Sequence, residues 1–377
     1  MLQENGTTEP AAFLQLSELA SESSGGRILF STDDFFAPAE GMLRDEEPIF
    51  IPDKYTDFGK WMDGWETRRK RIAGHDWCIV RLAAPTVIKG IVVDTAHFTG
   101  NFAPRMSIQG ARIDPRRERQ IAVRREGSIG TGCDGSEMEE KIKNFQWEEI
   151  VQNTPLKPGY DKTRKHYFGV DTNENVFTHL RVNIYPDGGI ARLRVYGVVQ
   201  PDRDSMADSA ELVDLIAMLN GGQCLEFSNA HYGHPRNLIK PQRGANMGDG
   251  WETARRNDRP AILTTDERGI LKVPGCEWAV FKLGMKGTVR RIVLDTNHFK
   301  GNFPDSVRIE AALLREDQDL EGAKWTVMLD NRKLSAHKEH IYEEDDLLAN
   351  APCTHIRITI APDGGISRLR LFGRCEK

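Results

Sequence analysis

The sequence predicts an all-β chain in which a short helix joins two tandem β-sandwiches. Three observations support this fold class: a set of motifs occurs twice in the same order, apolar residues mostly alternate with polar ones, and Gly, Pro and Asp interrupt these runs every few residues. Many short strands separated by turn residues, with few helices, are typical of antiparallel sandwiches. Each sandwich would be one copy of a duplicated domain.

Five motif pairs carry the duplication. They are DGWET at 63–67 and 249–253, GHDW and GCEW at 74–77 and 275–278, DTAHFTGNF and DTNHFKGNF at 94–102 and 295–303, THLR and THIR at 178–181 and 354–357, and PDGGI at 186–190 and 362–366. Internal repeats of this kind mark repeated structural units. We therefore expect four parts: an N-terminal segment with a short helix at 1–24, a first sandwich at 25–200, a linking helix within 201–220, and a second sandwich at 221–377.

Individual strands follow from the alternation of apolar side chains between turn residues. They are expected at 79–82, 88–93 and 193–196 in the first copy, and at 292–294 and 307–309 in the second copy.

The linking helix is predicted from apolar residues at helical spacing before a Gly-Gly pair. These residues are Leu212, Leu215, Ile216 and Leu219. Asp204 or Ser205 can cap the start of this helix, and Gly221 can end it. A weaker pattern of leucines before Gly25 and Gly26 favours a similar short helix ahead of the first copy.

Charge and targeting patterns exclude several classes of partner. The net charge of −5 leaves no positive field that would attract nucleic acid or an anionic membrane. No run approaches the roughly 18 apolar residues that span a bilayer. The first residues do not resemble a secretion signal, and residues 375–377 are not a peroxisomal tripeptide.

The cysteines indicate where the protein is located, and the absence of cofactor motifs excludes several classes of enzyme. Six scattered cysteines show neither a CxxC pair nor metal-ligand spacing, so we expect no disulfides and an intracellular, cytoplasmic location. No nucleotide-binding, zinc-peptidase or serine-hydrolase motif is present. Neither a metal nor a cofactor is expected.

The DTxHFxGNF motif places an acid and an imidazole three residues apart. Asp94 with His97, and Asp295 with His298, could form a couple in which the carboxylate orients the ring for proton transfer. The asparagines Asn101 and Asn302 add amide donors and acceptors. The alternative is structural: the aspartate caps a turn, and the histidine is held by hydrogen bonds. Duplication does not decide between them, because residues that determine a fold are also retained in both copies.

The DGWET motif surrounds a tryptophan with acids. Glu66 and Glu252 are candidate acids or bases, and the basic positions Arg69 and Arg255 behind them could clamp an anion. The Asp-Gly pair favours a turn, and the tryptophan is expected to anchor the core.

The PDGGIxRLR motif is a turn that leads into a strand. Arg192 and Arg368 are candidates to bind a ligand carboxylate, because a guanidinium binds a carboxylate through two parallel hydrogen bonds. The alternative, an arginine that pairs with an acid across the sheet, has equal weight.

From about residue 25 to 373, these blocks resemble the allantoicase family, whose members contain two allantoicase repeats. The segments FSTDDFFAP at 30–38 and FSNAHYGHP at 227–235 fit as well. The resemblance implies two jelly-roll sandwiches of the galactose-binding-like type and assembly into homo-oligomers. It also implies a hydrolase of purine catabolism (allantoin degradation) that cleaves allantoate, its small-molecule substrate, into ureidoglycolate and urea.

Site roles follow from the chemistry of that reaction. Urea leaves well only when its nitrogen is protonated, so the site needs an acid, and a base for the water. The hypothesis assigns proton transfer to the Asp–His couples, carboxylate binding to the PDGGIxR arginines and ureido contacts to the asparagines, with the two glutamates in reserve. One copy or both could be active. The alternative function is a non-catalytic ligand- or carbohydrate-binding sandwich, a pseudoenzyme of the same fold.

Overall fold

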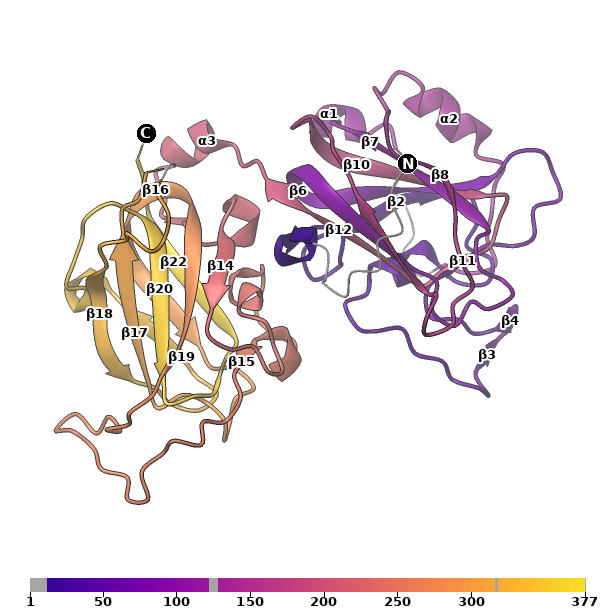
Figure 1. The fold of residues 1–377 in the computed structure, drawn as a ribbon. Coiled ribbons are helices and arrows are strands. Elements are labelled where there is room, and N and C mark those ends of the chain that lie inside the picture. Colours follow the sequence, from indigo (N-terminus) through magenta and orange to yellow (C-terminus); the bar gives the residue numbers. More distant parts are fainter. Residues whose placement is uncertain (1–11, 122–127, 316–317, 377) are drawn as a thin grey trace. The chain divides into compact units, whose positions relative to one another are not determined.

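The computed structural model describes residues 12–121, 128–315 and 318–376. The chain divides into two compact units, Met1–Gln200 and Pro201–Lys377, which Figure 1 shows in indigo to magenta and in rose to yellow. Each unit is built around one antiparallel eight-stranded sheet that folds over itself. The predicted all-β class is confirmed.

The first sheet has the strand order β1-β12-β6-β10-β7-β8, and β2 and β9 also pair with β6. Its strands are β1 (Ser17–Glu18), β2 (Arg27–Ser31), β6 (Asp76–Asp94), β7 (Arg105–Ala111), β8 (Glu148–Pro155), β9 (Lys165–Gly169), β10 (Val176–Tyr185) and β12 (Arg192–Val199). Two short pairs lie outside it: β3 (Tyr55–Thr56) with β4 (Gly59–Lys60), and β5 (Trp65–Glu66) with β11 (Gly189–Ile190).

Strand β6 turns this sheet into a sandwich, because it takes part in both layers. Residues 76–81 of β6 pair with β10 and β2, and residues 86–94 pair with β12. Strand β10 also reaches Thr86 and Val87, and β9 pairs with residues 90–94. Pro85, which lacks an N–H group, lies between these two segments, where a strand tolerates proline. The two strands predicted at 79–82 and 88–93 are therefore halves of one 19-residue strand.

The second sheet repeats this order as β13-β22-β16-β20-β17-β18, with β14 and β19 on β16. Its strands are β13 (Val213–Asp214), β14 (Gln223–Phe227), β16 (Glu277–Asp295), β17 (Ser306–Ala312), β18 (Thr326–Lys333), β19 (Glu339–Tyr342), β20 (Cys353–Ala361) and β22 (Arg368–Cys375). The short pair is β15 (Trp251–Glu252) with β21 (Gly365–Ile366).

Helices are short throughout the described residues. They are α1 (Pro115–Glu118), α2 (Ser136–Ile142), α3 (Arg203–Ala207) and the 3-10 turns η1 (Ala12–Gln15), η2 (Ala39–Leu43), η3 (Met218–Asn220), η4 (Pro235–Ile239), η5 (Met247–Asp249) and η6 (Glu344–Asp346). None is long and apolar enough to cross a membrane.

A short helix does follow the first sandwich, but it ends much earlier than predicted. Helix α3 begins at Arg203, where the Asp202 carboxylate accepts from the Ser205 N–H at 3.0 Å. The apolar residues predicted to continue it are not helical: Leu215 and Ile216 form a turn between β13 and η3, where both are fully buried, and Leu219 lies in η3. Gly221, in the left-handed conformation, ends η3.

The edges of both sheets lie upstream of the predicted domain starts. Strand β1 pairs with β12 at Ser17 and Glu18, and β13 pairs with β22 at Val213 and Asp214. Each sheet thus begins eight residues before the positions, 25 and 221, at which we expected the sandwiches to start.

The tryptophans of the two DGWET motifs anchor equivalent places in the two cores. Trp65 and Trp251 are completely buried. Each indole N–H donates at 2.8 Å to a backbone oxygen, that of Asp33 in the first copy and that of Asn229 in the second. Burial of a large aromatic ring together with its polar atom agrees with the structural role predicted for these residues.

Candidate active site

Three of the duplicated motifs meet in each sandwich. In the first, Glu66 of DGWET pairs with Gly189 of PDGGI, and the Gly189 N–H donates to the Asn101 oxygen at 2.8 Å. In the second, Glu252 pairs with Gly365, whose N–H donates to the Asn302 oxygen at 2.8 Å. Loops that are far apart in sequence therefore form one polar region in each copy.

The close approach of these loops explains a glycine of PDGGI. Gly188 has φ of 129°, and a Cβ there would lie 2.7 Å from the Ala103 backbone. Its carbonyl accepts from the Thr67 N–H at 3.1 Å. A side chain at this position would separate the motifs.

Glu66 is a buried carboxyl with one polar partner. Only 8% of its surface is exposed, and it accepts from the Asn101 side-chain amide at 2.7 Å. Burial disfavours the charged form more than this hydrogen bond favours it, and raises the pKa of Glu66 to about 7. A carboxyl that keeps its proton near neutral pH can act as a general acid.

The second copy has the same pair in a more open setting. Glu252 accepts from the Asn302 amide at 2.5 Å. Its side chain is only half-buried, and the Asn302 amide also contacts the Met247 sulfur at 3.6 Å. The glutamate–asparagine contact is thus duplicated, but the burial of the glutamate is not.

The predicted acid–imidazole couple is not formed in the first copy. Asp94 accepts from the Ala96 N–H at 2.8 Å and lies 3.4 Å from the Arg164 guanidinium. His97 has φ of 69°, and its Nε2 lies 3.0 Å from the Pro48 oxygen. Asp94 therefore caps a turn, as the structural alternative has it, and the His97 ring is turned toward another loop.

The hydrogen bond to Pro48 determines which nitrogen of neutral His97 is free. A carbonyl can only accept, so Nε2 carries the hydrogen and Nδ1 keeps its lone pair. The left-handed backbone of His97 costs about 1–2 kcal/mol in a residue with a side chain. Backbone strain of this kind gathers at functional sites.

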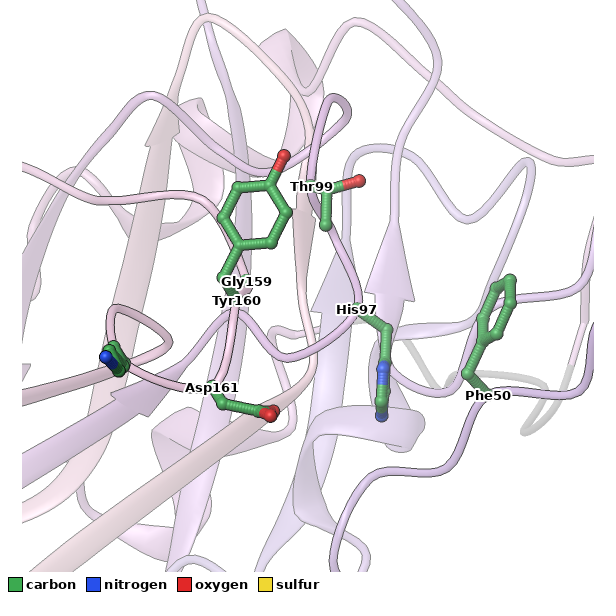
Figure 2. A pocket seen from close by; sticks show the side chains of 7 residues that line it. Phe50, His97, Thr99, Gly159, Tyr160 and Asp161 are labelled. Atoms are coloured by element: carbon green, nitrogen blue, oxygen red, sulfur yellow. The ribbon is translucent and has the colours of Figure 1, made fainter.

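His97 lines a hollow of about 570 Å³, together with Phe50, Thr99, Gly159, Tyr160, Asp161 and Lys162. Figure 2 shows the His97 side chain beside Phe50, with Tyr160 and Asp161 on the neighbouring loop. This volume suits a small-molecule ligand. Glu66 and Asn101 do not line the hollow, although Asn101 lies only two residues beyond Thr99.

In the second copy, the aspartate–histidine couple is absent for the same reason. Asp295 accepts from the Asn297 N–H at 2.8 Å and pairs with Arg243 at 2.8 Å. His298 again has a left-handed backbone, and its Nε2 lies 2.9 Å from the Gly244 oxygen. The prediction of a couple is therefore wrong for both copies.

The loop that faces this histidine differs in length between the copies. The Thr95 hydroxyl and N–H donate to the carbonyl oxygens of Lys157 and Arg164, so the facing loop has eight residues, 157–164. Thr296 makes the same two contacts to residues 335 and 338, which leaves four residues. The longer loop carries residues 159–162, which line the hollow beside His97.

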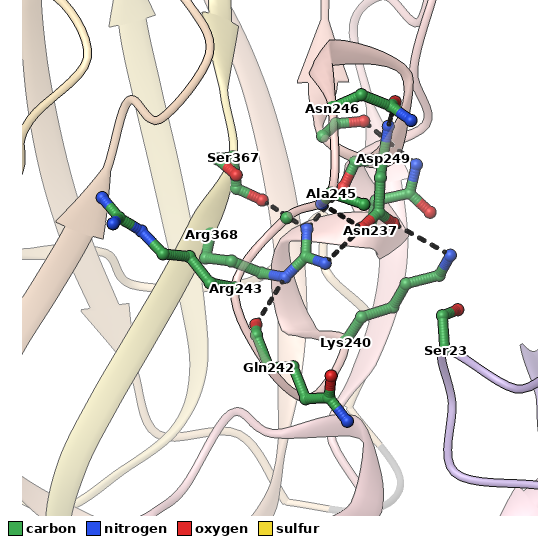
Figure 3. A network of polar contacts seen from close by, with 12 residues as sticks. Ser23, Asn237, Lys240, Gln242, Arg243, Ala245, Asn246, Asp249, Ser367 and Arg368 are labelled. Atoms are coloured by element: carbon green, nitrogen blue, oxygen red, sulfur yellow. Dashed lines mark hydrogen bonds and ion pairs between the residues drawn. The ribbon is translucent and has the colours of Figure 1, made fainter.

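Arg192 and Arg368 are buried, and their guanidinium groups bind oxygen atoms of the protein itself. The Arg192 guanidinium is 3% exposed and donates to the Asp63 carboxylate at 2.8 Å and to the backbone oxygens of Glu46, Gly41, Asp63 and Ala191. Figure 3 shows the equivalent network, in which Arg368 contacts Asp249, Gln242 and Ser367. These contacts correct the assignment of the two arginines to a substrate carboxylate, and agree with the alternative of pairing with an acid.

Arg69 and Arg255, in contrast, remain exposed. Within the described parts of the chain, neither guanidinium makes a hydrogen bond or an ion pair. These are the predicted arginines with free donors. Arg69 lines a second hollow of the first sandwich, described below.

Asp63 and Asp249, the acids that pair with the buried arginines, were not among the predicted site residues. Both begin a DGWET motif, where they were interpreted as turn residues. His166 and His340 were not predicted either; they accept from the N–H groups of Lys157 and Ser335 at 2.8 and 2.9 Å and so hold the loops beside His97 and His298. The order of the surrounding motifs could have aligned these histidines, but their flanking sequences differ.

No group of three or more His, Cys, Asp or Glu side chains is arranged to hold a metal ion in the described portion of the chain. The candidate site therefore consists of a buried carboxyl, an amide, an imidazole and free guanidinium groups.

Comparison with known proteins agrees with the duplicated architecture. The allantoicase repeat family model matches residues 17–200 and again residues 213–376. These matches begin where β1 and β13 open the two sheets.

Similar proteins match over almost their whole length. A probable allantoicase 1 from Burkholderia mallei is 44% identical, over 95% of this chain and 94% of the relative. A probable allantoicase from Acinetobacter baylyi is 40% identical, over 97% and 96%. The crystal structure of allantoicase from Saccharomyces cerevisiae matches with a TM-score of 0.69 and 32% identity, over 95% of this chain and 92% of that one.

Proposed function

This chain belongs to the allantoicase family, and on this premise we propose that it hydrolyses allantoate to ureidoglycolate and urea. The reaction breaks one of the two bonds between the central carbon and a ureido nitrogen. Water supplies the hydroxyl group that replaces the ureido group, and the departing nitrogen takes a proton. The observation that carries the proposal is the buried Glu66 carboxyl, held by the Asn101 amide, in a chain that matches the family over both repeats.

Glu66 is proposed as the general acid. Its pKa of about 7 leaves much of it protonated at neutral pH, so it can give a proton to the departing nitrogen. The Asn101 amide, which donates to the Glu66 carboxyl, holds that side chain in place. Asn101 remains the candidate to contact a ureido group, because it is otherwise exposed.

His97 is proposed as the base that activates water. Its Nε2 is occupied by the Pro48 carbonyl, so Nδ1 of the neutral ring is the nitrogen that can accept a proton. This role does not require the aspartate that the sequence suggested as its partner.

The first copy is proposed to carry the reaction, and the second to be structural. Glu66 is buried, whereas Glu252 is half-buried. His97 faces the longer loop, whereas the ring of His298 lies against that of His337, with ring centroids 6.0 Å apart. Asp295, His298, Glu252 and Asn302 would then preserve the fold rather than the chemistry.

We also propose a cytoplasmic homo-oligomer. All six cysteines are free, which is typical of a reducing compartment. The segment 49–58 exposes several large apolar side chains, Ile49, Phe50, Ile51, Tyr55 and Phe58, and a second copy of the chain could cover them.

The direct test is release of urea from allantoate by the purified chain. We expect urea and ureidoglycolate in equal amounts, with one stereoisomer of ureidoglycolate, because one ureido group must be selected. A folded protein that releases no urea at any allantoate concentration would contradict the proposal. If such a protein bound a sugar, the non-catalytic alternative would gain support.

A second test concerns His97. The variant His97→Asn is expected to lower kcat by about 10²- to 10⁴-fold, because a positioned base is lost. Asparagine tolerates the left-handed backbone, so the loop should keep its shape. The matched variant His298→Asn should retain most activity. Wild-type turnover in both variants would remove the histidines from the mechanism.

A further inference from the structure

The first sandwich has a second hollow, of about 650 Å³, beside the basic run 68–71. All four basic side chains of this run line it, with Phe35 and Phe36 among the other lining residues. Its chemistry therefore depends on which of the four positive charges the protein itself neutralises.

Two of these charges are neutralised by buried acids. The Arg68 Nε donates to the Asp33 carboxylate at 2.7 Å, and the Lys70 ammonium donates to the Asp76 carboxylate at 2.7 Å. The first pair is packed against the backbone: a Cβ on Gly132 would lie 2.2 Å from the Arg68 guanidinium. These two pairs form a fixed wall and leave no cation free for a ligand.

The other two charges have no partner. Arg69 and Arg71 are exposed, and neither makes a hydrogen bond or an ion pair with any residue that the structure describes. The remaining acid of the hollow, Asp134, accepts from the N–H and hydroxyl groups of Ser136 at 3.0 and 2.9 Å. The hollow thus presents two free guanidinium groups, which suit a small carboxylate.

The second copy has lost this arrangement. The positions that correspond to Asp33, Arg68 and Arg71 are Asn229, Ala254 and Asn257. The correspondence rests on equal contacts. The N–H groups of Lys70 and Arg256 donate to Asp187 and Asp363, in the two PDGGI loops. The N–H groups of Arg68 and Ala254 donate to the side chains of Asp33 and Asn229. Of the two free arginines, only Arg69 therefore has a basic counterpart in the second copy, which is Arg255.

We propose that Arg69 and Arg71 bind the carboxylate of the substrate and make the first copy selective for an anionic ureide. This inference rests on the proposed function. Glu66 and Arg69 are three residues apart, so their Cα atoms are at most about 10 Å apart, within reach of a long side chain. A substrate held by its carboxylate at Arg69 would thus lie on the same stretch of chain as the proposed acid.

The test compares two ligands that differ only in charge. Hydantoate carries one ureido group and a carboxylate, and ureidoacetamide replaces the carboxylate by a neutral amide. Calorimetry on the full chain should show tighter binding of hydantoate to the wild type. Arg69→Ala and Arg71→Asn should each weaken hydantoate binding by ~10- to 100-fold, the range for hydrogen bonds to charged groups, and leave ureidoacetamide binding unchanged.

The control is Arg112→Ala, which removes an exposed arginine that lines neither hollow. It should bind both ligands as the wild type does. The proposal is overturned if the wild type does not prefer hydantoate, or if both variants bind it unchanged. Urea release separates the two proposals: a wild type that prefers hydantoate through these arginines but releases no urea contradicts the function alone. Active variants with an unchanged KM for allantoate contradict the carboxylate site alone.

Discussion

Urea release from allantoate is expected to fall ~10²- to 10⁴-fold when Glu66 is replaced by glutamine, because the amide cannot give a proton to the departing nitrogen. Glutamine has almost the same shape and can still accept from Asn101, so the loops should remain in place. In the wild type, activity should decline as the pH rises through about 7, where Glu66 loses its proton. Steady-state rates between pH 5 and 9 would show both effects.

The same substitution should make the protein more stable at alkaline pH. The folded state binds the Glu66 proton more tightly than the unfolded state, whose carboxyl has a pKa near 4.5. The stability contributed by this proton is fully present below that value and is lost as the pH rises through about 7. Above pH 7 the loss is on the order of 3 kcal/mol, which Glu66→Gln should recover in guanidinium unfolding at pH 8 but not at pH 4.

The matched variant is Glu252→Gln, which changes the half-buried glutamate of the second copy. It should keep most of the activity. A Glu66→Gln enzyme with wild-type rates would eliminate the proposed acid, and equal losses in the two variants would show that both copies take part in the reaction.

Replacing Arg192 by methionine is expected to destabilise the first sandwich by about 3–5 kcal/mol, the range for breaking a buried ion pair by removing one partner. Burial, the largest single influence, opposes ionisation of Asp63, but the hydrogen bonds from Arg192 and the Ile49 N–H, together with the positive charges of Arg192 and Arg44, hold the pKa of Asp63 below its usual value. Without Arg192, the Asp63 carboxylate keeps the hydrogen bonds from Arg44 and the Ile49 N–H but loses its buried cation, and several backbone oxygens lose a donor.

Guanidinium unfolding at several pH values would measure this effect. The lowered pKa of Asp63 contributes stability above the ordinary value of 3.8, and this contribution is lost as the pH falls through the folded value. The difference between wild type and variant should therefore shrink in acid. Arg112→Met serves as the exposed control. A loss below about 1 kcal/mol for Arg192→Met would mean that the pair does not hold the loops together.

The fold could be predicted because the sequence motifs that indicate it occur in both halves of the chain. Motifs that recur in order indicate two copies, and alternation indicates strands. The length of β6 could not be predicted, because a proline such as Pro85 usually ends a strand. Only the pairing of β6 on both sides of Pro85 shows that the strand continues there from one layer to the other. The linking helix ends earlier than predicted because Leu215 and Ile216 satisfy helical spacing, yet they are buried in a turn that follows β13.

The site was harder to predict, because the spacing of residues in the sequence does not show in which direction their side chains point. Asp94 and His97 are three residues apart, yet the left-handed backbone at His97 turns the ring away from the carboxylate. Arg192 has the chemistry of an anion binder, but Asp63 uses it, and no local pattern links residues 129 positions apart. Glu66 was only a reserve candidate for the acid, because its burial, which raises its pKa, is known only from the structure.

The strand that crosses between layers has a mechanical consequence for each half of the chain. Neither layer of a sandwich can unfold alone, because one strand, β6 in the first sandwich and β16 in the second, makes hydrogen bonds in both layers. Each sandwich is therefore tied into one cooperative unfolding unit. A destabilising change in the first unit, such as one at Arg192, would spread through both of its layers.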